Sequence, residues 1–323
     1  MSEPLPIVAT GPLPEWAAEQ FRPYPLVFCE AFTYEAVFSR VGPGVVGIVA
    51  RGPVLIDAEM ISAATELRVI GRSGVGYDTV DIAAATQRKI PVVYTPGAMS
   101  RVVAEHTLAL ILGAAKNLMG WHRVVLEGEW EERYQNPNLD LEGSVVGIVG
   151  FGRIGREVWH LLEPFGVQAL VHDPYVVADE PPVKGVRFVS LEELLSSSDV
   201  VTLHAPSTEE TQNLIHRGNI DQFKRGAILV NAARGALMES HDLLHQALES
   251  GRLRCVALDV FVSEPPDRSH PLFRHPGTVL TAHVGSSTPG AQNRIVETVV
   301  ADMKAVLDGR RPRPENLVNP EIY

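Results

Sequence analysis

Short apolar runs alternate with helix-period segments along almost the whole chain. From Ile7 to about Pro96 each run is brief and rich in valine, isoleucine and leucine, which suits strands buried on both faces. The alternation predicts a small parallel α/β domain. Its expected strands are Ile7–Ala9, Leu26–Cys29, Val45–Ala50, Leu67–Gly71 and Pro91–Tyr94, and its expected helices are Glu15–Phe21, Tyr34–Arg40, Asp57–Ala64 and Thr79–Arg88.

The same alternation returns after residue 144 and continues to Leu307. Between the two parts lies a longer helix-period stretch, Ala104–Leu126, which predicts one long helix leading into the second domain. The fold class that follows is α/β, with two Rossmann-like, doubly wound parallel-sheet domains. The second part predicts strands at Val145–Val149, Gln168–His172, Asp199–Leu203, Ala227–Asn231, Leu253–Asp259 and Thr278–Thr281, and helices at Leu191–Ser196, Ser240–Ser250 and Pro289–Leu307.

One segment carries a glycine pattern with a known physical use. Gly150, Gly152 and Gly155 directly follow a predicted strand and open a helical segment that runs to Leu162. The first glycine permits a tight turn, the second lets the backbone approach a pyrophosphate, and the third lets the helix pack on the strand. Asp173 ends the next strand, where a carboxylate can accept hydrogen bonds from ribose hydroxyls and repel a 2′-phosphate. The sequence therefore predicts a dinucleotide site that prefers NAD to NADP.

Composition narrows the class of protein. At 323 residues the chain is long for one core, which favours two domains. Its formal net charge of −11 argues against a surface that binds nucleic acid or anionic membrane. The two cysteines, Cys29 and Cys255, lie among apolar residues, and the N-terminal segment does not resemble a signal peptide. No apolar run is long enough to span a bilayer, so we expect a cytoplasmic protein without nucleic-acid or membrane partners.

Three ionisable residues follow successive predicted strands: Arg234, Glu264 and His283. Because the carboxyl ends of parallel strands meet at one edge of a sheet, the fold would bring them together. A guanidinium can hold the carboxylate and carbonyl oxygens of a 2-oxo acid, and a protonated imidazole can give that carbonyl oxygen a proton. A carboxylate beside the imidazole favours its protonated form. Taken singly, the three could also be a surface arginine, a turn acid and a buried strand-end histidine.

Two further patterns admit a functional and a structural explanation. The loop Gly71–Asp78 follows a predicted strand, and its amides could face an anion, or it could be an ordinary flexible connection. His241 and His245 are spaced like metal ligands on one helix face. No carboxylate or third histidine accompanies them at a fixed spacing, so we expect no metal site.

These motifs resemble those of the D-isomer-specific 2-hydroxyacid dehydrogenase family, which includes phosphoglycerate dehydrogenases and glyoxylate–hydroxypyruvate reductases. The likeness runs over nearly the whole chain, and its motifs occur in the family's order. The segments that carry it are Leu229–Leu237 for the arginine motif, Ala257–Pro265 for the glutamate motif, Thr281–His283 for the histidine motif, Val201–Pro206 for the loop flanking the cofactor, and Gly71–Asp81 for a first-domain loop whose amides bind substrate carboxylate.

The resemblance implies a role for each matching residue. Arg234 would anchor the substrate carboxylate, His283 would be the acid–base and Glu264 its partner, while His204 would line the cofactor site. The implied cofactor residues are Gly150, Gly152, Arg153, Ile154, Gly155, Asp173, His204, Ala205, Pro206, Thr211, Ala232, Asp259 (near the nicotinamide carboxamide) and Gly285. The implied substrate residues are Ser73, Gly74, Val75, Gly76, Arg234 and His283.

The resemblance also implies an architecture and an activity. An NAD-binding Rossmann domain, residues 101–288, would be inserted into a flavodoxin-like substrate domain, residues 1–100 plus 289–323. The helix after Ala104 would build a homodimer. The expected activity is NAD-dependent hydride transfer between the nicotinamide and C2 of a small D-2-hydroxy acid or its 2-oxo partner.

Some positions depart from the family pattern. Ala282 stands where proline is common, and Arg51–Val54 differs from the Arg-Ser-x-Thr of many phosphoglycerate dehydrogenases, which weakens the expectation of a phosphorylated substrate. The chain stops at Tyr323, which implies a short form without the regulatory domain of many serine-pathway enzymes. Two alternatives stay open: a relative that oxidises formate or phosphite, and an NAD-gated, non-enzymatic binding protein similar to the C-terminal-binding corepressors.

Overall fold

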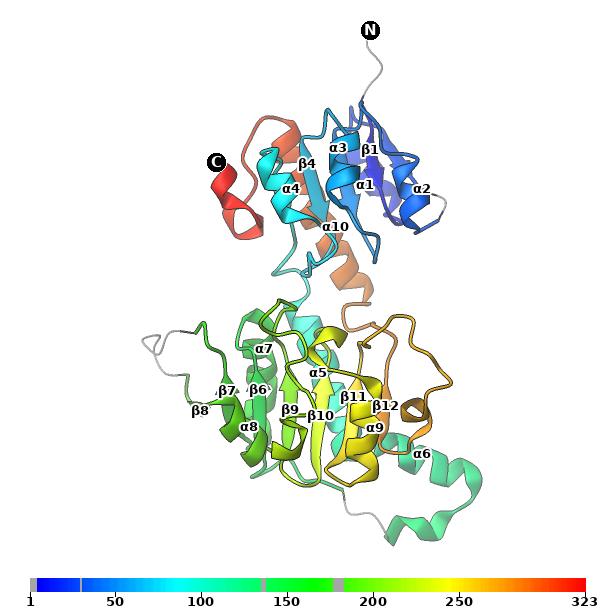
Figure 1. Ribbon diagram of the computed structural model, residues 1–323, viewed down its shortest axis with the longest axis vertical. Helices are drawn as coiled ribbons and strands as arrows, with labels where there is room; N and C mark the ends of the chain where they lie inside the picture. Colours follow the sequence, from blue (N-terminus) through cyan, green and yellow to red (C-terminus); the bar gives the residue numbers. More distant parts are fainter. Residues whose placement is uncertain (1–4, 30, 135–137, 177–182) are drawn as a thin grey trace. The chain divides into compact units, whose positions relative to one another are not determined.

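The computed structural model describes residues 5–29, 31–134, 138–176 and 183–323. Its contacts divide the chain into two compact units, shown in Figure 1. Unit 1 comprises Met1–Met99 and Ser287–Tyr323, and unit 2 comprises Ser100–Ser286. Unit 2 is therefore inserted, in chain order, between two parts of unit 1.

Unit 1 is built on five parallel strands in the order β2-β1-β3-β4-β5. This order is the flavodoxin-like one, in which the chain winds outward in both directions from a central strand. The strands are β1 (Ile7–Ala9), β2 (Leu26–Phe28), β3 (Gly47–Ala50), β4 (Val69–Arg72) and β5 (Val92–Val93). Each strand predicted from an apolar run in this part of the sequence is confirmed.

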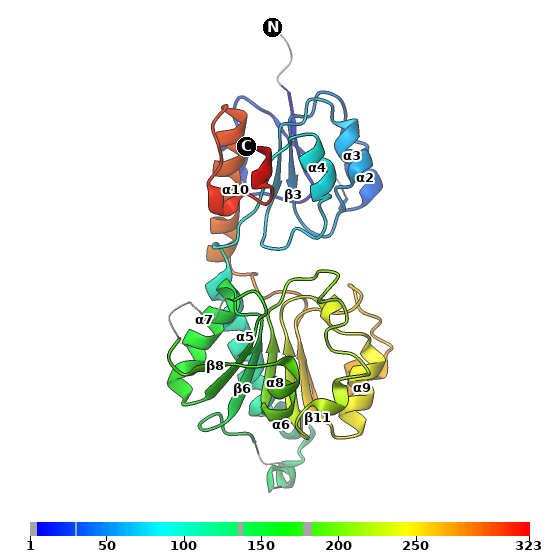
Figure 2. The ribbon, with the colours of Figure 1, turned by 60° about the vertical axis from the view of Figure 1, so that its left-hand side comes forward.

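Helices cover both faces of the unit 1 sheet, as Figure 2 shows for α10 on one side and α2 to α4 on the other. The alternation along β1 decides which side chain enters which core: Ile7 and Ala9 pack under α1 and α10, whereas Val8 packs under the other three helices. The helices are α1 (Glu15–Gln20), α2 (Tyr34–Phe38), α3 (Ala58–Ala63), α4 (Ile82–Gln87) and α10 (Pro289–Leu307).

Unit 2 contains seven parallel strands in the order β12-β11-β10-β9-β6-β7-β8. Helices α5 and α7 pack on one face, and α8 and α9 pack on the other. The strands are β6 (Val145–Val149), β7 (Gln168–His172), β8 (Val186–Phe188), β9 (Val200–Leu203), β10 (Ala227–Asn231), β11 (Leu253–Leu258) and β12 (Thr278–Leu280). The helices are α5 (Ser100–Ala115), α6 (Leu118–Glu127), α7 (Arg153–Leu162), α8 (Leu191–Ser197) and α9 (His241–Glu249). The predicted fold class of two parallel-sheet α/β domains is confirmed.

The sequence prediction missed the strand β8. This edge strand has only three residues, with the charged Arg187 at its centre and Phe188 44% exposed. Backbone pairing with β7 forms it, and no buried apolar run announces it.

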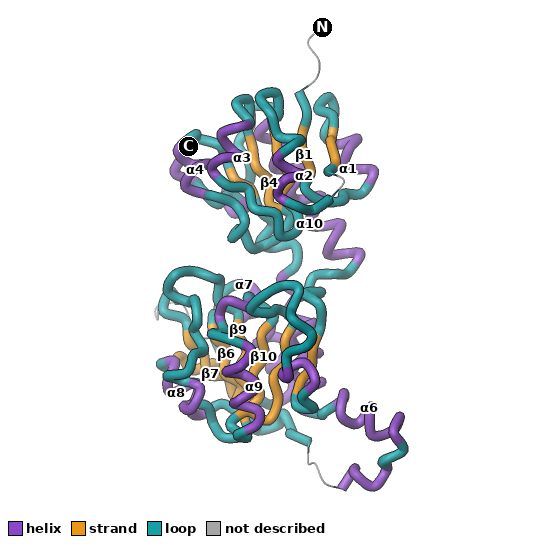
Figure 3. The backbone as a smooth tube through the Cα atoms, turned by 45° about the vertical axis from the view of Figure 1, so that its right-hand side comes forward, coloured by secondary structure: helices purple, strands orange, loops and turns teal. Residues whose placement is uncertain are grey.

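The expectation of one long helix over Ala104–Leu126 was wrong. The chain breaks between α5 and α6, which are bent by 54° to one another, and Asn117 at the break has a left-handed φ of 48°. Asparagine tolerates this conformation better than most residues, and the apolar pattern continues through the break, so periodicity could not reveal it. Figure 3 shows α6 extending away from the sheet of unit 2, and no α6 residue is buried.

No single helix in the described part of the chain is long and apolar enough to cross a membrane. Helices α5 and α6 reach that length and composition only when they are counted together.

Candidate active site

The turn between β6 and α7 needs glycine at two of its three glycine positions. Gly150 has a φ of +89°, and a Cβ there would lie 2.7 Å from the Ala205 nitrogen. A Cβ on Gly155 would lie 2.2 Å from the Gly150 carbonyl oxygen, so helix and turn can approach only without one. A Cβ on Gly152 would meet nothing within 4 Å, and this residue is exposed. The backbone at Gly152 is thus open to a ligand, while its neighbours hold the turn closed.

The start of α7 and the end of β7 complete an anion and ribose site. Gly152 caps α7 without a side-chain hydrogen bond, so the first helical N–H groups can donate to a phosphate. The half-buried carboxylate of Asp173 accepts hydrogen bonds from the amides of Phe151, at 2.7 Å, and Tyr175, at 2.9 Å. Each of its oxygens retains a further lone pair for a ribose hydroxyl. The donor set and the open backbone fit a dinucleotide.

The segment after β9 lies beside the end of β6, next to the glycine turn. The backbone amide of His204 donates to the Val149 carbonyl oxygen at 2.7 Å, and the His204 ring nitrogen Nε2 lies 3.0 Å from Thr202 Oγ1. Burial lowers the pKa of His204 to about 4, so the ring is neutral at pH 7 and cannot serve as the proton donor. Farther along, Thr211 Oγ1 donates to the Pro206 carbonyl oxygen, at 2.6 Å, and holds the loop in place.

His283 and Glu264 form a hydrogen-bonded pair. His283 Nδ1 lies 2.8 Å from Glu264 Oε2, and Glu264 Oε1 accepts the Phe261 amide at 3.1 Å. The His283 side chain is 53% exposed, so solvent or a ligand can reach the ring. Its φ of 53° lies in the left-handed region, which a non-glycine residue adopts at a cost and which often marks functional positions.

A buried carboxylate anchors the loop that carries His283. Asp259 is 1% exposed and accepts hydrogen bonds from Thr281 Oγ1 at 2.6 Å and from the amides of Val284 and Gly285 at 2.9 Å each. His106 Nε2 of α5 lies 3.3 Å from the same carboxylate. Burial would raise the pKa of Asp259, but the hydrogen bonds from these four residues outweigh it and hold the pKa well below the usual range. The expected contact of Asp259 with a nicotinamide carboxamide stays a prediction.

Arg234 lies in a loop shaped by Asn231. The Asn231 side chain accepts the Ala233 amide at 3.0 Å and donates to the Arg234 carbonyl oxygen at 2.8 Å, while Arg234 Nη1 donates to the Ala233 carbonyl oxygen at 2.7 Å. A Cβ on Gly235 would lie 1.7 Å from the Phe261 carbonyl oxygen, so the arginine loop packs directly on the loop of Glu264. The remaining predicted cofactor residues of unit 2 lie at the same edge: Arg153 and Ile154 in the first turn of α7, Ala232 after β10, and Gly285 after β12.

In unit 1, the loop after β4 has backbone amides of two kinds. Those of Ser73 and Gly74 donate to carbonyl oxygens of the same unit, at 2.9 Å each. Those of Val75 and Gly76 have no acceptor among the described residues. The hydroxyl of Ser73 is buried and lacks a hydrogen-bond partner within the same described part. Two amides and one hydroxyl of this loop can therefore take an anion, whereas the other two amides are already used.

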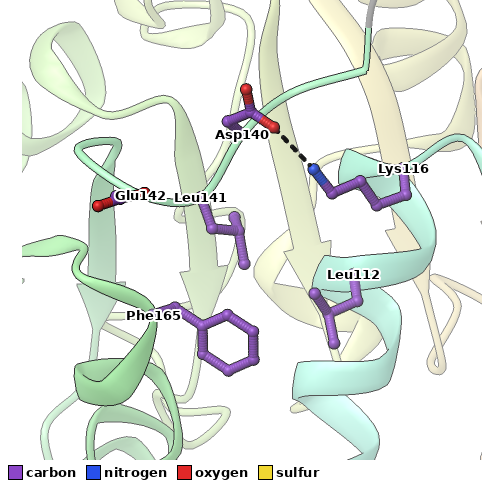
Figure 4. A pocket seen from close by; sticks show the side chains of 6 residues that line it. All are labelled: Leu112, Lys116, Asp140, Leu141, Glu142 and Phe165. Carbon is purple, nitrogen blue, oxygen red and sulfur yellow. Dashed lines mark hydrogen bonds and ion pairs between the residues drawn. The ribbon is translucent and has the colours of Figure 1, made fainter.

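An open pocket of about 450 Å³ lies in unit 2, away from these loops. Figure 4 shows Lys116 facing Asp140, and their charged groups are 3.0 Å apart. The other lining residues, Leu112, Leu141, Glu142 and Phe165, include some that come just before β6 and β7. The pocket is thus at the amino-terminal edge of the sheet, opposite the glycine turn.

The sequence prediction missed three residues that support the site: His106, Asn231 and Thr281. His106 Nε2 lies 3.0 Å from Thr281 Oγ1 as well as close to Asp259. A histidine inside the apolar face of α5 was the available signal, because a buried polar side chain requires a partner. In the described ranges, no group of three or more His, Cys, Asp or Glu side chains is placed to hold a metal ion.

Residues 108–285 match the NAD binding domain of D-isomer specific 2-hydroxyacid dehydrogenases. The chain belongs to the D-isomer specific 2-hydroxyacid dehydrogenase family. Unit 2 is the NAD-binding domain of this family member, which confirms NAD as the cofactor.

Individual relatives agree with this placement. A D-3-phosphoglycerate dehydrogenase of Archaeoglobus fulgidus is 40% identical over 280 residues, which cover 87% of this chain and 52% of the relative. A glyoxylate reductase of Thermofilum pendens is 37% identical over 272 residues, covering 83% of this chain and 79% of the relative. Among solved structures, D-lactate dehydrogenase from Aquifex aeolicus, complexed with NAD and lactic acid, also matches this chain.

That lactate dehydrogenase structure has a TM-score of 0.88 at 26% identity, and the match covers 97% of this chain and 99% of the other. The chain spans about half the length of the curated phosphoglycerate dehydrogenases that it matches. Membership of the family therefore identifies the fold and the cofactor, and it leaves the substrate to be inferred.

Proposed function

We propose that this protein is an NAD-dependent dehydrogenase that interconverts a small D-2-hydroxy acid and its 2-oxo acid. The observation that carries the proposal is the His283–Glu264 pair, 2.8 Å apart, on strand-end loops of an NAD-binding domain. Such a pair can supply and accept a proton next to a hydride-transfer cofactor. His204, another histidine at this edge, is neutral at pH 7, and we assign it a structural role in the cofactor wall.

Each proposed role follows from the chemistry of the side chain. NADH, when bound, supplies the hydride that reduces C2 of the 2-oxo acid. Protonated His283 gives its Nε2 proton to the C2 oxygen, because Nδ1 is held by Glu264. The nearby carboxylate stabilises the imidazolium before transfer and the correct tautomer after it. In the reverse direction, neutral His283 takes the hydroxyl proton as hydride leaves C2.

Each unit has donors that suit a substrate carboxylate. The guanidinium of Arg234 can hold a carboxylate oxygen and the C2 oxygen in a planar arrangement. Within unit 1, the amides of Val75 and Gly76 and the Ser73 hydroxyl can bind a carboxylate. The amides of Ser73 and Gly74 already donate to carbonyl oxygens, so we assign them no contact with the substrate.

We also propose a homodimer that uses α6 and the segment after it. Large apolar side chains there are exposed, and a second copy of the chain would cover them. The exposed residues are Leu118, Met119, Val125, Leu126, Trp130 and Tyr134.

A turnover assay tests the proposed activity. NADH oxidation is followed by absorbance with glyoxylate, hydroxypyruvate, pyruvate and bulkier 2-oxo acids, and formate and phosphite are tried with NAD. We expect turnover with at least one 2-oxo acid and its loss in His283→Ala, while NADH fluorescence titration shows unchanged cofactor binding.

The matched control for His283→Ala is His160→Ala, which changes an exposed histidine in the last turn of α7. Turnover of formate or phosphite alone would favour the anion-oxidising alternative. NADH binding without turnover of any compound would favour a non-enzymatic, NAD-gated binding protein, and full activity of His283→Ala would show that the acid–base is misassigned.

A further inference from the structure

Four histidines of unit 2 that the proposed reaction does not use gather against α9. His241 and His245 lie on α9, and His270 and His275 flank the short helical turn at 271–274. The ring centroids of His241 and His270 are 5.7 Å apart, those of His245 and His270 are 6.3 Å apart, and those of His245 and His275 are 6.0 Å apart. We name this group the histidine cluster.

Three rings of the histidine cluster accept a backbone N–H. Val262 donates to His241 Nε2 at 3.2 Å, Leu272 to His270 Nδ1 at 3.1 Å, and Gly277 to His275 Nδ1 at 2.9 Å. An imidazole nitrogen accepts a hydrogen bond only when it carries no proton, so protonating that nitrogen breaks the bond. The His241 bond joins α9 to the connection between β11 and β12, whereas the other two bonds lie within that connection. All three bonds depend on protonation.

Only the His241 bond in this group reaches the candidate active site. Val262 directly follows Phe261, whose amide donates to Glu264 Oε1 at 3.1 Å. The other oxygen of Glu264 faces His283 at 2.8 Å. A ring on α9 therefore fixes the backbone of the short loop that aims Glu264 at the acid–base.

Burial of His241 favours its neutral form. The titratable groups that shift its pKa are Asp242 on its own helix and His270 from the segment packed against it. His245 lies one turn farther along α9, and Phe261 and Phe273 pack edge-to-face against the His241 ring. Burial, followed by the proximity of His270, lowers the pKa of His241, and Asp242 acts in the opposite direction. The Val262 bond is therefore intact at neutral pH.

We propose that His241 is a positioning residue for Glu264, and that its protonation releases Val262 and misaligns the Glu264–His283 pair. The inference rests on the proposed function. In the direction of 2-oxo acid reduction, His283 must carry a proton, so a fall in pH does not remove the proton donor. The part of an acid-side loss of kcat that His241→Gln removes then reports His241.

Glutamine at position 241 keeps an acceptor for the Val262 N–H but cannot be protonated as histidine can. In His241→Gln the amide oxygen can accept the Val262 N–H at every pH. The matched control is His245→Gln, since the described contacts of His245 include no bond from a backbone N–H. His241→Ala removes the acceptor altogether and should lower kcat at every pH, with His241→Gln restoring it at neutral pH.

The pH profile of kcat for 2-oxo acid reduction, measured from about pH 5 to 8, is the first readout. We expect wild type and His245→Gln to lose kcat together as the pH falls, while KM changes less. One pH unit below the pKa of His241 about nine tenths of the rings are protonated, so His241→Gln should be about tenfold faster than wild type there. Acid limbs that coincide for wild type and His241→Gln overturn the inference.

Hydrogen exchange at the Val262 amide is the second readout and needs no turnover. In NADH-bound wild type, the protection of the Val262 amide, measured relative to its intrinsic exchange rate, should decrease as the pH is lowered. In His241→Gln this protection should stay constant. Constant protection in wild type overturns the inference, whatever the activity. Absence of turnover with every 2-oxo acid overturns the proposed function instead, and the exchange result still decides whether His241 holds Val262.

Discussion

Replacing the buried Asp259 with asparagine should loosen the loop that carries His283. The carboxylate accepts hydrogen bonds from Thr281, Val284 and Gly285 and lies 3.3 Å from His106 Nε2. Asparagine has the same shape, but one of its two polar atoms is a donor. In either orientation of the amide, an N–H group therefore faces a donor that a carboxylate oxygen now accepts.

These contacts set the loss in free energy of unfolding that Asp259→Asn should cause. Hydrogen bonds to a charged group contribute about 1.5–3 kcal/mol, and a buried donor left without an acceptor costs about 1–3 kcal/mol. Losing one such bond to a backbone amide and weakening the rest should lower the free energy of unfolding by about 3 kcal/mol. Because His283 donates its amide to the Asp259 carbonyl oxygen at 2.8 Å, the acid–base should lose its alignment, and kcat should fall as well.

Urea unfolding of NAD-free protein and steady-state reduction of the best 2-oxo acid measure the two effects. Asp221→Asn is the control, since the Asp221 side chain is 84% exposed, and it should change the unfolding free energy by less than about 0.5 kcal/mol. If Asp259→Asn unfolds at the same urea concentration as wild type and keeps its kcat, the buried carboxylate does not anchor the loop.

Two further predictions concern the cofactor edge. Asp173→Ala should raise the affinity for NADPH relative to NADH by roughly tenfold, because the variant lacks the carboxylate that repels a 2′-phosphate. Fluorescence titration measures both dissociation constants, and Asp221→Ala is the control. An unchanged ratio of the two constants would remove Asp173 from the ribose site. His204 has a folded-state pKa of about 4 against about 6.5 when unfolded, so its neutral form stabilises the fold above pH 6.5, and this contribution is lost as the pH falls toward 4. The difference corresponds to about 3 kcal/mol. The unfolding free energy of His204→Asn should therefore depend less on pH in this window than that of wild type or of the control His160→Asn. Parallel curves for the three proteins would contradict this prediction.

Much of the fold follows from local pattern, because a strand buried on both faces must be apolar along its length. The strand at Val145–Val149 and the glycine turn after it were predictable, since the tight turn at Gly150 and the close helix at Gly155 each need glycine. The break at Asn117 and the edge strand Val186–Phe188 were not, because the first interrupts no apolar pattern and the second buries too little.

The sequence by itself determined the residue types of the site and the order in which they follow the strands. Only the tertiary structure decided which of them meet. Parallel pairing of β10, β11 and β12 brings distant loops to one edge, where Glu264 contacts His283 and Asp259 collects donors from the 281–285 loop. His241 looked in sequence like half of a metal site, and in the fold it accepts the amide of Val262. The type of a side chain decides which interactions it can make, and long-range packing decides with which partner it makes them.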